Sequence, residues 1–152
     1  MDNIYDATGR VEFNTPAKVI LIIGASLSGF GLLSSLFYMQ FVSIIFCVVT
    51  LSCQLWLLIK RVRLPYYIMI VSYAISHGYN IISSANVLAQ VQESYTDMGL
   101  NTALVDSLFT IGFYIGIAIG ILFAAGFLIL IFVLIRKQWK YMPLYSGTTK
   151  QQ

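Results

Sequence analysis

The sequence predicts an all-α integral membrane protein, a four-helix bundle whose N and C termini both face the cytoplasm. Hydrophobic residues make up 59% of its 152 residues and charged residues 10%, whereas about 25% of residues are charged in ordinary soluble domains. A soluble fold could not bury so much apolar surface, so the bilayer is expected to be the solvent. The spacing of the charged residues predicts the number of spans, and their distribution predicts the orientation.

The first half of the chain is expected to cross the membrane twice. Between Lys18 and Lys60 there is no charged residue. A single helix of that length would measure about 60 Å, twice the hydrocarbon thickness of about 30 Å. We therefore expect a cytoplasmic tail over residues 1–15, followed by spans over residues 16–37 and 41–60 that are joined by a short turn.

The second half is expected to cross twice more. Pro65 suits the first turn of a third span over residues 65–91. The last and most apolar run predicts a fourth span over residues 103–137. The four-helix domain would then cover residues 16–139, and residues 140–152 would form a cytoplasmic tail.

The basic residues predict the orientation. Four spans place the N-terminal segment, the 60–63 loop and the segment from Arg136 on one side, and these segments hold all nine Lys and Arg residues. The outer side holds only the acidic residues Glu93, Asp97 and Asp106. By the positive-inside rule, both termini are expected to face the cytoplasm, or the matrix or stroma if the membrane belongs to an organelle.

Small residues recur every fourth position in the last span and predict a helix-packing ridge. The ridge comprises Gly112, Gly116, Gly120 and Ala124. A similar set in the first span comprises Gly24, Ser28 and Gly29. Lipid-exposed helices associate where small residues let the backbones approach. The two sets are expected to pack within one chain, or the ridge forms an interface between copies; spacing alone does not separate these alternatives.

One face of the third span is polar. A helical wheel at about 100° per residue gathers eight residues on it: Ser72, Tyr73, Ser76, His77, Asn80, Ser83, Ser84 and Gln90. Polar groups are costly against lipid tails, so this face is expected to meet other helices or water. It predicts either interhelical hydrogen bonds or a pore or ligand pocket with Asn80 at the midplane. His77, the only histidine, is either a hydrogen-bonded bundle residue or a proton sensor.

The C-terminal tail contains a short trafficking pattern. Tyr141 is followed three residues later by Leu144, which matches the Tyr-x-x-bulky apolar signals that clathrin adaptor subunits read as an extended peptide. The alternative is that Tyr141, next to Trp139 and Lys140, anchors the chain at the membrane interface.

Several function classes are not expected. The sequence has no Gly-rich phosphate loop, nucleophile elbow, metal-ligand cluster or carboxylate pair. We therefore expect no cofactor, no metal and no enzyme activity, with a lipid-handling membrane enzyme as the remaining enzymatic alternative. Nucleic acid is not an expected partner because the basic residues flank membrane spans.

The leading hypothesis is a structural, assembly or accessory subunit that acts through helix packing. Its partners would be membrane lipid and either copies of itself or a larger membrane protein. The alternative is an oligomeric channel or carrier with the polar face of the third span lining a neutral pathway. A plasma membrane or endomembrane location is favoured.

Overall fold

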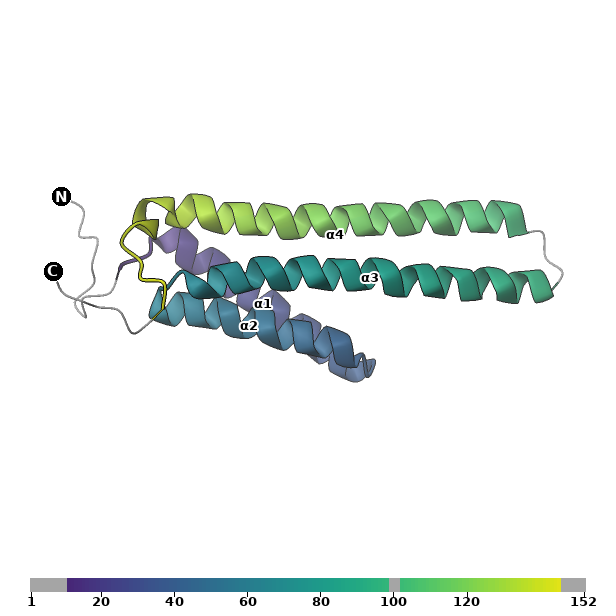
Figure 1. Ribbon diagram of the computed structural model, residues 1–152, viewed down its shortest axis with the longest axis horizontal. Coiled ribbons are helices and arrows are strands. Elements are labelled where there is room, and N and C mark those ends of the chain that lie inside the picture. The colour runs from purple at the N-terminus through teal and green to yellow at the C-terminus, as the bar shows by residue number, and fades with distance from the viewer. Residues whose placement is uncertain (1–10, 99–101, 146–152) are drawn as a thin grey trace. The chain divides into compact units, whose positions relative to one another are not determined.

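The computed structural model describes residues 11–98 and 102–145, and these form four helices and no strand. In chain order they are α1 (Thr15–Phe37), α2 (Phe41–Lys60), α3 (Leu64–Asp97) and α4 (Thr102–Trp139) (Figure 1). The prediction of an all-α chain with four helices is confirmed. The third helix ends at Asp97, and the bounds of the expected span over residues 65–91 stay a prediction.

Three helical segments are long and apolar enough to cross a membrane. They are Thr15–Phe37, Phe41–Lys60 and Thr110–Trp139. Large apolar side chains such as Phe30 lie on the outside, where Phe30 is 74% exposed, as expected of a surface that lipid covers. The findings therefore support a membrane protein. The polar residues of α3 make that helix less apolar than the other three, and a fourth span stays a prediction.

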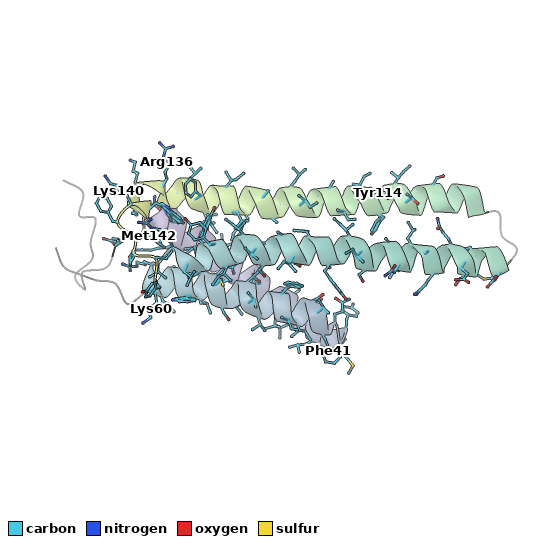
Figure 2. All side chains as sticks on the ribbon, viewed as in Figure 1. Phe41, Lys60, Tyr114, Arg136, Lys140 and Met142 are labelled. Carbon is cyan, nitrogen blue, oxygen red and sulfur yellow. The ribbon has the colours of Figure 1, made fainter. Side chains whose placement is uncertain are left out.

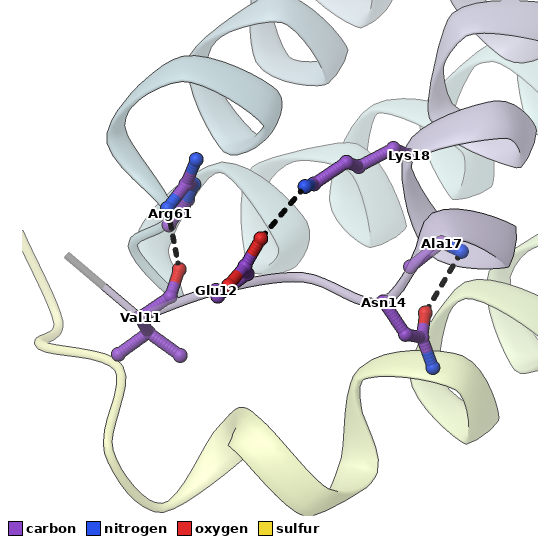
Figure 3. A network of polar contacts seen from close by, with 6 residues as sticks. All are labelled: Val11, Glu12, Asn14, Ala17, Lys18 and Arg61. Atoms are coloured by element: carbon purple, nitrogen blue, oxygen red, sulfur yellow. Dashed lines mark hydrogen bonds and ion pairs between the residues drawn. The ribbon is translucent and has the colours of Figure 1, made fainter. Parts of the chain in front are cut away.

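The first helix begins at a capped N-terminus. The Asn14 side chain accepts a hydrogen bond of 2.9 Å from the backbone N–H of Ala17, and Pro16 occupies the first turn (Figure 3). The cap satisfies one of the free N–H groups that every helix start leaves. The Asn14 amide also donates to the carbonyl of Leu134 at 3.1 Å. This single residue therefore starts α1 and ties it to α4.

Two left-handed residues end the first two helices. Met39, with φ of 52°, makes the turn from α1 to α2, and Arg61, with φ of 55°, follows the last residue of α2. The Arg61 N–H donates to the carbonyl of Leu57 at 3.0 Å, which is the bond of a left-handed C-terminal cap. The chain thus turns within three residues after each helix, and α1 and α2 pack against each other.

The chain divides into two compact units. The first comprises Met1–Tyr73 and Phe127–Gln152, and the second is the stretch Ala74–Gly126. All four helices contribute to the core of the first unit, through side chains that are at most 1% exposed: Leu21, Leu57, Met69, Ile131 and Ile135. The second unit consists of the C-terminal part of α3 and the N-terminal part of α4, which run side by side (Figure 1).

Gly24 is a point of close approach within the first unit. It is buried, and a Cβ atom placed there would overlap the ring of Phe127 on α4 and lie 3.2 Å from Nε2 of Gln54 on α2. By contrast, a Cβ atom at Gly29 of the same helix would meet no heavy atom within 4 Å. Of these two residues, only Gly24 is required to be small by its described neighbours.

We predict that Gly24→Leu destabilises the protein by about 1–3 kcal/mol, the usual cost of overpacking. The matched control Gly29→Leu should be neutral or mildly stabilising, because leucine favours the helix more than glycine does. Thermal unfolding in detergent checks both variants. Equal melting temperatures for the two variants would contradict this account of Gly24.

Candidate functional site

The polar face of α3 is divided between the two units. Ser72 and Tyr73 belong to the first unit, where Ser72 is buried. The other described members lie in the second unit: Ser76, His77 and Ser83 are half-buried, and Asn80 and Gln90 are exposed. The side chain of Ser84 lies outside the described residues. The described residues of this face are therefore considered separately in each unit.

A buried polar cluster in the first unit was not predicted from the sequence. Gln54 on α2 is only 1% exposed, and its Oε1 accepts a 3.1 Å hydrogen bond from the hydroxyl of Ser28 on α1. Tyr73 of α3 also interacts with the side chain of Gln54. Ser28 was expected only as a small packing residue. The available signal was that Gln54 is the only amide residue in the second apolar run.

This cluster keeps unused hydrogen-bonding capacity. Among the described residues, the hydroxyl of Ser72 has no hydrogen-bond partner. Buried amides and hydroxyls are normally paired, and an unpaired group is most costly where water is absent. The hydrogen bond from Ser28 to Gln54 fixes the register of α1 against α2.

The glycine ridge of α4 is open over its outer part. A Cβ atom at Gly112 or Gly116 would meet no heavy atom of the described residues within 4 Å, and both residues are exposed. At Gly120 the Cβ position lies 3.5 Å from Cε1 of His77 on α3. Ala124 is half-buried. The structure thus assigns Gly120 to the α3–α4 hairpin, while the expected pairing of Gly112 and Gly116 with small residues of the first span stays a prediction.

The acidic residues expected on the outer side lie at and near the end of α3. Glu93 and Asp97 are both exposed and one helical turn apart. The side chain of Asp106, at the start of α4, lies outside the described residues. The two described carboxylates can attract cations, as the sequence suggested.

The opposite ends of the helices carry a cluster of basic residues. Lys60, Arg136 and Lys140 lie at the same end of the first unit as Met142 (Figure 2). Arg61 donates a 2.9 Å hydrogen bond from Nη1 to the carbonyl of Val11, in the segment before α1 (Figure 3). In that segment Glu12 pairs with Lys18 at 3.3 Å.

Arg63 makes the corresponding contacts with the segment after α4. Its Nε donates to the carbonyl of Met142 at 2.6 Å, and its Nη2 donates to the carbonyl of Lys140 at 3.2 Å. The guanidinium also lies 5.8 Å from the centre of the Trp139 ring, within the range of a cation–π contact. Sequence reasoning used these arginines only as orientation signals, because a charge pattern does not show which carbonyls a guanidinium reaches.

The described residues contain no group of three or more His, Cys, Asp or Glu side chains that could hold a metal ion. Comparisons of the chain with protein families, curated proteins and solved structures find no match. The arguments for function therefore rest on the faces and contacts described above.

We predict that Gly120→Leu displaces the His77 imidazole, because a side chain at residue 120 would enter the space beside that ring. The expected effects are a changed NMR signal of the single histidine and a loss of about 1–3 kcal/mol of stability. Gly126→Leu is the matched control on the same helix, since its Cβ position is open. An unchanged His77 signal in Gly120→Leu would refute this contact.

Proposed function

We propose that the protein is a small four-span membrane protein, with both termini in the cytoplasm, that acts as a structural or accessory subunit. It would assemble through the α3–α4 hairpin with copies of itself or with a larger membrane protein. The single observation that carries the proposal is the open Gly112–Gly116 face of an otherwise apolar helix. Plasma membrane or endomembrane is the favoured location.

The orientation is supported by the contacts of the basic residues. Arg61 binds the segment before α1, and Arg63 binds the segment after α4. The N-terminal segment, the short loop and the C-terminal segment therefore lie together, as they would on one side of a membrane. Basic residues concentrate on the cytoplasmic side of membrane proteins.

The assembly face is supported by small and polar groups that the described chain leaves open. Gly112 and Gly116 would let another helix approach closely, and the exposed amides of Asn80 and Gln90 would form hydrogen bonds with it. An amide exposed to lipid tails would lack partners, so α3 gains from an assembly that covers it. Membrane lipid would cover the remaining apolar surface.

We predict that Gly116→Leu reduces the mass of the nanodisc-embedded particle or removes a co-purifying protein, because leucine blocks close helix approach. Gly126→Leu, which also has an open Cβ position, should leave the assembly intact. Mass measurement of the intact particle and mass spectrometry of its components check both variants. A wild-type particle containing one chain and no partner, or an assembly unchanged in Gly116→Leu, would refute the proposal.

A second candidate is an oligomeric channel or carrier. The observation that favours it is the exposed amide of Asn80 on the polar face of α3, together with the exposed carboxylates of Glu93 and Asp97 at the end of that helix. Amides and hydroxyls can replace part of the hydration of a permeating solute, and acidic residues at a mouth favour cations.

For this candidate we predict that purified protein in liposomes conducts cations and that Asn80→Leu abolishes the flux. Asn86→Leu is the matched control, because Asn86 is also exposed on α3 but is not part of the polar face. Flux measured under several ion and solute gradients checks this. Absence of any flux, or the same flux in Asn80→Leu as in wild type, would exclude the channel.

A further inference from the structure

The C-terminal segment Tyr141–Leu144 is bound along its backbone by the loop between α2 and α3. The carbonyl of Pro143 accepts a hydrogen bond from the Arg63 N–H, and the carbonyl of Leu144 accepts one from the Leu64 N–H, both at 3.0 Å. The Arg63 side chain binds the Met142 carbonyl at 2.6 Å. Three successive carbonyls of the segment are therefore occupied.

The side chains of this segment differ in their exposure to solvent. Met142 is only 1% exposed and belongs to the same hydrophobic core as Phe13 and Tyr66. Tyr141 and Leu144 are 36% and 50% exposed. The two side chains that define the Tyr-x-x-Leu pattern are thus exposed, while Met142 between them anchors the segment.

We infer that Arg63 holds this Tyr-x-x-Leu segment in a closed state, and that its release creates a ligand for a clathrin adaptor subunit. A protein that reads an extended peptide uses the peptide's main-chain groups for affinity and alternate side chains for specificity. The main-chain groups are engaged by the α2–α3 loop, so the adaptor and the loop compete for the same segment. The inference is independent of the proposed assembly and depends only on access of a cytosolic protein to this end of the chain.

Arg63 is the residue that controls the closed state. It supplies three of the four hydrogen bonds to carbonyls of residues 140–144, from its side chain and its backbone. Its guanidinium lies against the ring of Trp139, where its planar shape allows contact with the ring and with two carbonyls together. A single ammonium group cannot reproduce that geometry, so lysine is a poor substitute at this position.

The test is binding of a purified clathrin adaptor subunit to the full-length protein in nanodiscs, where both membrane faces are accessible. Arg63→Ala should bind about tenfold or more tightly than wild type, as expected when charge-assisted hydrogen bonds that hold the segment are lost. Met142→Lys should also bind the adaptor subunit more tightly, because a charged side chain would leave the hydrophobic core and release the segment. This variant tests the inference independently if Arg63→Ala does not fold. Adding Tyr141→Ala to either variant should remove the binding.

Two controls complete the experiment. A free peptide of residues 138–152 should bind as the released variants do, and Lys60→Ala, which removes an exposed charge at the same end, should behave as wild type. Wild-type protein binding as tightly as the peptide would show that the segment is not closed. No binding by the peptide and by both released variants would show that it is not an adaptor ligand. Either result overturns the inference.

Discussion

The arrangement at the basic end depends on guanidinium groups bound to backbone carbonyls. Arg61 and Arg63 stand two residues apart in the α2–α3 loop, and their side chains bind carbonyls from the two opposite ends of the chain. Arginine suits this position because it stays charged and presents several N–H donors in a fixed geometry. The same residues favour the cytoplasmic side of a membrane. One pair of side chains thus ties both the segment before α1 and the segment after α4 to the α2–α3 loop.

Inside the first unit, the helices are held together by close backbone approach and hydrogen bonds, which take over much of the stabilising role that the hydrophobic effect has in soluble proteins. Apolar side chains gain little by leaving lipid for one another, so contact area and polar bonds decide how helices pack. Gly24 lets the Phe127 ring approach α1, and the adjacent Gln54 accepts the hydrogen bond from Ser28. Gln54 therefore contributes specificity as well as stability, because it pairs with one position on α1 and not with its apolar neighbours.

The helices and the turn after Phe37 were predictable, because charge-free length and membrane thickness leave few alternatives. Hydropathy alone does not mark the end of α3, since Gln92 and Glu93 are good helix formers and polarity by itself does not end a helix. The turn-forming residues from Asp97 onward mark it better. The site was less predictable. The four-residue spacing predicted that Gly120 belongs to a helix-packing ridge. It did not indicate that the His77 ring would lie beside this glycine. The arginine contacts also depend on folded geometry that a charge pattern does not contain.

The lengths of α3 and α4 connect the fold to the proposed assembly. These helices have 34 and 38 residues, against 23 and 20 for α1 and α2, whereas about 20 residues cross a bilayer. On the proposed orientation, the apolar part of α4, Thr110–Trp139, crosses the hydrocarbon core with a tilt. Gly112 and Gly116 then lie in lipid near its outer boundary, where apolar side chains gain little by leaving lipid for one another. The proposed assembly therefore depends on the dispersion contacts that close approach at these two open glycines allows.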